Sequence, residues 1–160
     1  MDDQFPEDLL QGHKRNLTLF WLVFVFEPLF YLILPWVVND LEVEGMMPDV
    51  ALYAKWGFYF LAVILAVASI LVHRVLLSDR RLQAMRVEEA LRSYLSTELA
   101  TWSLNGAIPL GGVFMFFLSG DVQLLVILSI LGMVLNLLAR PRLDVFVERV
   151  RELHYGAGRF

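Results

Sequence analysis

Glu27 has the clearest potential for chemistry in this chain, because it interrupts the apolar run of residues 17–38 (LTLFWLVFVFEPLFYLILPWVV). A carboxylate near the middle of a membrane-spanning helix costs about 2.5–3.5 kcal/mol and has to face protein or water. Pro28 follows it and removes a backbone hydrogen bond, which leaves a carbonyl free for a proton, a cation or a polar side chain. Tyr31, one turn further on the same face, is a candidate hydrogen-bond partner.

Two roles fit Glu27. It is either a proton- or cation-binding group in a transport path, or an interhelical polar contact that holds its helix to another helix or to a partner subunit. Residues 17–38 hold no second carboxylate that could form a relay, which favours the packing role. Lys55 lies near the far end of the next apolar run and can extend outward, so we do not expect it to pair with Glu27.

Small residues interrupt a later apolar run, residues 100–118 (ATWSLNGAIPLGGVFMFFL). Ser103, Ala107 and Gly111 recur every four residues and would lie on one face of a helix. Small side chains on one face let two membrane helices approach closely. This spacing therefore predicts a helix-packing groove.

Asn105 and Pro109 in the same run also resemble the break of a discontinuous helix, the kind found around transported substrates. Close packing is the commoner cause of such a composition. Asn136 lies in residues 122–139, at the depth of Asn105 if the two segments run antiparallel. We therefore predict a hydrogen bond between the two asparagines.

Catalytic, metal and cofactor sites are not expected. The chain has no cysteine, which excludes disulfides, thiolate metal sites, iron–sulfur clusters and c-type haem attachment. Its histidines, His13, His73 and His154, lack the spacing of three or four residues that places two ligands on one helix. No nucleotide-binding, hydrolase or metalloprotease motif occurs. We expect a non-enzymatic protein.

The elements that position these residues are apolar runs. Hydrophobic residues make up 58% of the chain and charged residues only 19%, whereas a soluble domain is about half apolar and a quarter charged. A span needs about 20 residues to cross roughly 30 Å of hydrocarbon. The predicted spans are residues 17–38, 51–77, 100–118 and 122–139, the last two joined by a tight turn.

The positive charges predict the orientation of these spans. Lys and Arg lie before the first run, in the loop of residues 78–99 with its flanks, and in the tail of residues 140–160, with Lys55 as the exception. Residues 39–50 hold four acids and no base. Positive charge accumulates on the cytoplasmic side. We therefore expect both termini in the cytoplasm and the protein in the inner (plasma) membrane.

Two cytoplasmic segments have helical periodicity, one in residues 78–99 and one in the tail. The tail places the following apolar residues on one stripe: Leu143, Phe146, Val147, Val150 and Leu153. Either segment lies along the inner membrane surface, with its apolar face in the lipid, or packs against the ends of the spans. The pattern leaves both arrangements open.

The stretch EEALRSYLSTELATWSLNGAIPLGGVFMFFLSGD, followed by a further span and by Ala139-Arg140-Pro141-Arg142, resembles small four-helix bacterial inner-membrane proteins of unassigned function. The likeness covers about residues 88–142. The hairpin is superficially similar to the proton-carrying hairpin of rotary ATP synthases, but its two runs hold no carboxylate at mid-depth. The resemblance therefore implies no functional residue.

These patterns predict an all-α integral membrane bundle of four antiparallel transmembrane helices with amphipathic cytoplasmic helices, in a single domain of residues 1–160. The leading hypothesis is a structural, assembly or accessory subunit of an inner-membrane complex. Its partners would be the lipid bilayer and either another membrane protein or further copies of itself. The alternative is a small proton or cation transporter or channel that uses Glu27. A net charge of −4 without a basic stripe gives no reason to expect nucleic acid.

Overall fold

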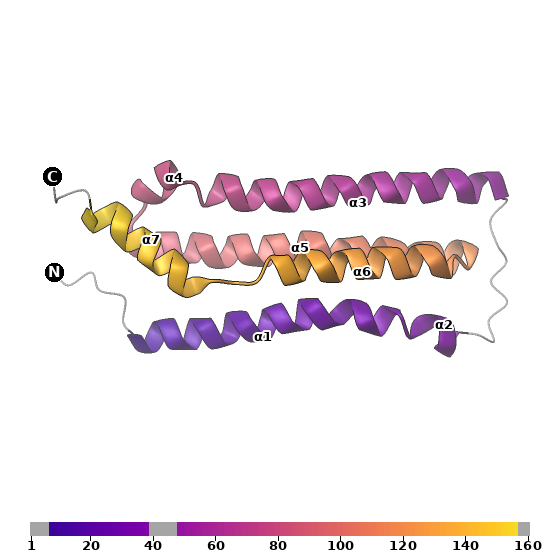
Figure 1. The fold of residues 1–160 in the computed structure, drawn as a ribbon, viewed down its shortest axis with the longest axis horizontal. Helices are drawn as coiled ribbons and strands as arrows, with labels where there is room; N and C mark the ends of the chain where they lie inside the picture. The colour runs from indigo at the N-terminus through magenta and orange to yellow at the C-terminus, as the bar shows by residue number, and fades with distance from the viewer. Residues whose placement is uncertain (1–6, 39–47, 157–160) are drawn as a thin grey trace.

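The computed structural model describes residues 7–38 and 48–156, and its regular elements are α-helices. In chain order they are α1 (Glu7–Tyr31), α2 (Leu34–Val37), α3 (Pro48–Leu76), α4 (Asp79–Gln83), α5 (Val87–Ser119), α6 (Val122–Leu138) and α7 (Leu143–Tyr155). In Figure 1, α1, α3, α5 and α6 lie lengthwise beside one another, and α4 and α7 gather at one end, here called the α7 end. The predicted all-α class is confirmed.

The helices include segments suited to a bilayer. Two stretches, Asp49–Gln83 and Val87–Ser119, are long and apolar enough to cross a membrane. There is a third candidate span if α6 and α7, whose axes differ by 45°, form one span. At a rise of 1.5 Å per residue, the 17 residues of α6 alone extend about 26 Å, slightly less than a hydrocarbon core.

The first predicted span, residues 17–38, is divided between two helices. α1 begins earlier, at Glu7, and ends at Tyr31, and α2 follows after two turn residues. Pro35 accounts for the break, because it has no N–H for the carbonyl of Tyr31 and restricts the residue before it. Pro28, by contrast, lies inside α1 without ending it.

The third apolar run belongs to a longer helix than predicted. α5 continues for 33 residues from Val87 to Ser119, with Pro109 inside it. The amphipathic segment of residues 78–99 is thus α4 followed by the first part of α5, so the prediction that it is helical is confirmed. The alternative of a discontinuous helix between Asn105 and Pro109 is wrong.

A tight turn joins α5 and α6 into the predicted hairpin. Gly120 caps α5 with φ of 68°, a left-handed conformation that favours glycine. Asp121 caps α6 by accepting a hydrogen bond of 2.9 Å from the N–H of Leu124, and it also pairs with Lys55 of α3 at 2.9 Å. Burial opposes ionisation of Asp121, but the Leu124 N–H and the Lys55 ammonium hold the pKa of its carboxyl below the ordinary value.

The α7 end has a protein core of its own. The predicted stripe on α7 is buried at Leu143, Phe146, Val147 and Val150, and the Phe146 ring stacks on Tyr94 of α5 with 4.3 Å between ring centroids. The proposal that these segments lie with their apolar faces in the membrane surface is therefore wrong for α7. Packing against the ends of the long helices, the other alternative, is confirmed.

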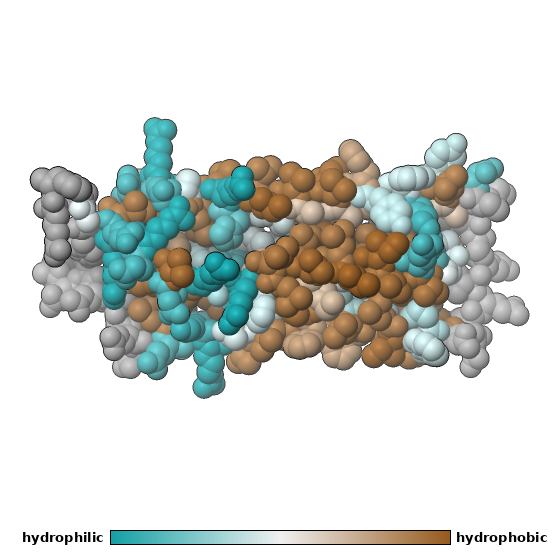
Figure 2. All heavy atoms as spheres, viewed as in Figure 1, coloured by the Kyte–Doolittle hydropathy of each residue, from teal (hydrophilic) through white to brown (hydrophobic). Residues whose placement is uncertain are grey.

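The outer surface between the two ends is apolar. Figure 2 shows an apolar band along the long helices, with hydrophilic side chains concentrated at the α7 end and a smaller polar zone toward the opposite end. Large apolar side chains of α1 and α3 are more than half exposed, such as Val23 at 63%, Phe30 at 68% and Phe60 at 69%. An apolar surface of this extent requires a lipid or protein partner.

Candidate functional site

Glu27 lies on α1 where this helix faces α5. Its side chain is half-buried. The Tyr31 hydroxyl donates a hydrogen bond to Oε1 of Glu27, so the predicted partnership within α1 is confirmed. The other carboxyl oxygen, Oε2, lies against Gly106 of α5, 3.6 Å from the position that a Cβ there would occupy. Glu27 thus contacts a second helix at a residue without a side chain.

One turn before Glu27, Asn136 of α6 meets the carbonyl that Pro28 leaves free. Proline at position 28 cannot donate to the carbonyl of Phe24, four residues earlier. The Asn136 side chain donates to this carbonyl from Nδ2 at 3.0 Å. The sequence predicted a free carbonyl in this place, and the structure identifies a polar side chain of another helix as the group that binds it.

The second proline inside a long helix is covered by α6 as well. Pro109 leaves the carbonyl of Asn105 without its intrahelical donor. Gly132 of α6 packs directly on this position, because a Cβ at Gly132 would lie 2.5 Å from Cγ of Pro109 and 3.0 Å from the Asn105 carbonyl oxygen. Only glycine permits this approach of the two backbones.

Four buried side-chain oxygens in α5 and α6 have no hydrogen-bond partner within the described part of the chain. They are Thr101 Oγ1, Asn105 Oδ1, Ser129 Oγ and Asn136 Oδ1. All four residues are at most 4% exposed. Buried polar atoms in this state call for a proton donor, a water molecule or an ion. Buried positions of α5 and α6 therefore hold oxygens with unused capacity to accept a hydrogen bond.

The predicted hydrogen bond between Asn105 and Asn136 is wrong. Both carbonyl oxygens of these side chains lack a partner, because the amide group of Asn136 turns to the Phe24 carbonyl on α1. The two side chains therefore do not form the predicted hydrogen bond with each other.

The predicted packing groove is only partly formed. Gly111 makes the closest contact, since a Cβ there would lie 2.9 Å from the Phe58 ring of α3. Ala107 is half-buried, and Ser103 is exposed. The glycines that the sequence did not single out, Gly112 and Gly132, make the close contacts between α5 and α6.

Two tryptophans fix the end of α6. The last carbonyls of a helix have no intrahelical donor. Trp21 of α1 donates from Nε1 to the carbonyl of Asn136 at 2.7 Å, and Trp102 of α5 donates to the carbonyl of Ala139 at 2.9 Å. Side chains from both neighbouring helices thus satisfy carbonyls where α6 ends.

Sequence reasoning missed the polar contacts at the α7 end. Glu98 of α5 is 3% exposed, and its carboxylate lies 3.5 Å from Nε2 of His73. The Tyr94 hydroxyl of the same helix accepts a hydrogen bond from the Arg142 N–H at 2.9 Å. Periodicity gives no signal for such contacts between helices.

Comparison of the chain with family models, with curated proteins and with solved structures finds no match in any of the three. The residues that the structure describes contain no group of three or more His, Asp or Glu side chains that could hold a metal ion. The class of protein is therefore defined by the fold alone. The chain is an all-helical protein with two helices that are long and apolar enough to cross a membrane, or three if α6 and α7 form one span.

The contact between Asn136 and the Phe24 carbonyl gives a testable prediction. Asn136→Leu should lower the free energy of unfolding by about 0.6–1.7 kcal/mol, the range of interhelical hydrogen bonds in membranes. In a Pro28→Ala background, residue 28 regains its N–H and supplies the Phe24 carbonyl from within α1. The cost of Asn136→Leu should then be smaller. A double-mutant cycle measured by unfolding in detergent gives the difference.

Gln123→Leu is the matched control, because Gln123 is an exposed polar residue of the same helix. It should show no coupling to residue 28. An equal cost of Asn136→Leu in both backgrounds would contradict the assigned hydrogen bond.

Proposed function

We propose that the chain is a non-enzymatic protein of the inner (plasma) membrane with four antiparallel spans and both termini in the cytoplasm. The spans would be α1 continued by α2, α3, α5 and α6. The lengthwise arrangement of these helices (Figure 1) and the apolar band around them (Figure 2) support this placement. The helices α4 and α7 and the start of α5 lie together at one end, in agreement with the orientation that their positive charges predict.

Within that architecture, we propose the role of a structural, assembly or accessory subunit. The single observation that carries this proposal is the hydrogen bond from Asn136 to the Phe24 carbonyl, since it uses a polar group of the apolar zone to join α6 to α1. Glu27 is likewise engaged, by Tyr31 and against Gly106. Such contacts favour a defined packing of helices that presents large apolar faces outward.

α3 is the helix best placed to meet a partner. Only 17% of the apolar window in Asp49–Gln83 is buried, against 50% in α5. Its outward face includes Tyr53, Trp56 and Phe60, each at least 65% exposed. Aromatic side chains are enriched where membrane proteins and other proteins bind one another.

Labelling of single cysteines tests the topology, and the chain offers a clean background because it has no cysteine. Arg15→Cys, Gln83→Cys and Glu152→Cys should react with a membrane-impermeant maleimide only after the membrane is opened. Gln123→Cys, beside the hairpin turn, should react in intact spheroplasts. Labelling of Arg15→Cys and Gln83→Cys from opposite sides would contradict the four-span arrangement.

Native mass spectrometry of the protein, extracted from its own membrane in lipid nanodiscs, tests the role as a subunit. We expect a complex of fixed stoichiometry, either with another membrane protein or between copies of the chain. Substitution of the exposed Trp56 and Phe60 by alanine should reduce this complex, whereas Val145→Ala at the α7 end should not. A monomer in every preparation would overturn the proposal.

A second candidate function, transport of protons or small cations, is favoured by the half-buried Glu27 together with the four buried side-chain oxygens of α5 and α6 that lack a hydrogen-bond partner. Flux into proteoliposomes that contain a pH-sensitive dye separates the two candidates. If the chain is a structural subunit, wild-type protein and Glu27→Gln both match protein-free vesicles. Flux through the wild type that is lost in a folded Glu27→Gln variant would establish transport instead.

A further inference from the structure

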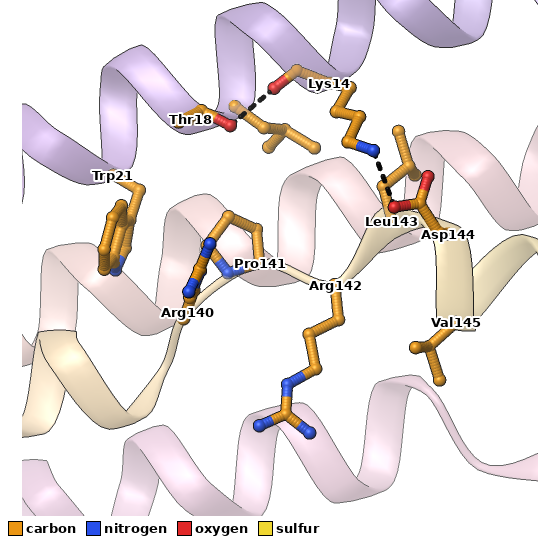
Figure 3. Close-up of a pocket in the computed structure, with 10 residues that line it drawn as sticks. Lys14, Thr18, Trp21, Arg140, Pro141, Arg142, Leu143, Asp144 and Val145 are labelled. Atoms are coloured by element: carbon orange, nitrogen blue, oxygen red, sulfur yellow. Dashed lines mark hydrogen bonds and ion pairs between the residues drawn. The ribbon is translucent and has the colours of Figure 1, made fainter.

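The chain bends between α6 and α7, and the bend encloses one side of an open cavity of about 340 Å³. Figure 3 shows Arg140 and Pro141 of the bend near Trp21 and Lys14 of α1, whereas the side chain of Arg142 extends from the same bend away from α1. The first turn of α7 completes the lining. The cavity lies at the α7 end, beside the apolar zone of the long helices.

The cavity carries an excess of positive charge. Its lining residues include three cationic ones, Lys14, Arg140 and Arg142, of which Arg142 turns its guanidinium away from α1, and one acidic one, Asp144. Lys14 and Asp144 form an ion pair of 2.6 Å, with side chains 56% and 75% exposed. An exposed pair of this kind is weak and exchanges readily with another anion.

The two arginines have no carboxylate partner among the side chains that the structure describes. Arg140 instead lies over the Trp21 ring, 5.8 Å from its centroid, and Trp21 is itself fixed by its hydrogen bond to the Asn136 carbonyl. A guanidinium held in this way presents its N–H groups in a fixed fork, which matches the oxygens of a phosphate.

Further donors come from the backbone. No side chain caps the N-terminus of α7, so the N–H groups of its first turn have no acceptor within the helix. Leu143 and Asp144 of this turn line the cavity. The backbone thus adds hydrogen-bond donors to the charged side chains.

Apolar surface borders the same cavity. Val145, which lines it, is 63% exposed. Leu138, at the end of α6, is 77% exposed and lines a second cavity, which shares Arg140, Arg142 and Val145 with the first. A free phosphate would gain nothing from these side chains, whereas the acyl chains of a lipid would cover them. Basic pockets between membrane helices at the cytoplasmic side bind anionic headgroups.

We propose that this cavity binds the phosphate of an anionic phospholipid headgroup in the cytoplasmic leaflet. Arg140 contacts the phosphate oxygens, Lys14 releases Asp144 and binds the same phosphate, and the acyl chains lie along α6. Arg142 extends from the other side of the bend and adds positive charge there. The proposal rests on the four-span placement above, and it does not depend on whether the chain has a protein partner.

The test is a lipid titration of the full chain in detergent, followed by native mass spectrometry. We expect phosphatidylglycerol to bind at least tenfold more tightly than phosphatidylcholine. Arg140→Gln combined with Arg142→Gln should remove this preference. Arg80→Gln combined with Arg81→Gln is the matched control, since it removes the same charge from exposed residues outside the cavity.

Asp144→Asn provides a test that does not depend on the stability of the arginine variants. Loss of the only carboxylate in the lining should tighten binding of phosphatidylglycerol several-fold. Equal binding in the two double variants, or no change in Asp144→Asn, would overturn the proposal. Competition by millimolar inorganic phosphate as effective as that by phosphatidylglycerol would identify a site for soluble phosphate and would equally overturn the assignment to a lipid.

Failure of the subunit role and failure of this site are distinguishable. A monomer that retains the preference for phosphatidylglycerol would contradict only the subunit proposal. A stable complex without lipid preference would contradict only the lipid site. Cysteine labelling of the double variants establishes that the loss of positive charge has not inverted the chain.

Discussion

A backbone carbonyl without a donor is costly where water is absent, and two prolines create this problem inside the long helices. Pro28 frees the Phe24 carbonyl in α1, and Pro109 frees the Asn105 carbonyl in α5. The same helix, α6, covers both positions. Its Asn136 donates to the first carbonyl, and its Gly132 packs against the second. The position and rotation of α6 between its neighbours follow from these two contacts.

The molecule has two parts with different surroundings, the apolar band along the long helices and the polar α7 end. Along the apolar band, side chains such as Phe60 face outward, so helix association there depends on close packing and polar contacts more than on burial from water. At the α7 end, Tyr94, Phe146 and Val150 form an ordinary buried core. Hydrophobic burial holds α7 in place in this part. α5 passes through both parts and joins them.

Much of the fold could be predicted from local patterns. The helical class, the hairpin turn at Gly120 and the apolar stripe of α7 all follow from periodicity and from turn residues. The hydrogen bond between Glu27 and Tyr31 could be predicted because both residues lie on one helix, four positions apart. Lys55 and Asp121 share the same predicted end of the bundle, so their ion pair was also within reach of the sequence.

For the candidate site, the sequence predicted only how far along its helix each polar residue lies. Sequence gives the height of Asn136 along its helix, but not its rotation toward α1 or α5, so the expected partner was Asn105 and the observed one is the Phe24 carbonyl. Whether a proline lies within a helix or ends it also depends on the neighbouring helices. Pro28 is tolerated where another helix supplies a donor, whereas Pro35 coincides with the end of α1. A single sequence does not contain the positions of neighbouring helices.

Trp21 connects the packing of the apolar zone to the cavity at the α7 end. Its indole donates to the carbonyl of Asn136, the same residue whose side chain binds the Phe24 carbonyl. The face of its ring lies under Arg140. An anion bound by Arg140 would therefore hold this guanidinium against the Trp21 ring, which is already bonded to α6. The bound anion would thus favour the contact between α6 and α1. In this arrangement a lipid headgroup is a structural component of the helix packing, which agrees with a chain whose polar groups join helices.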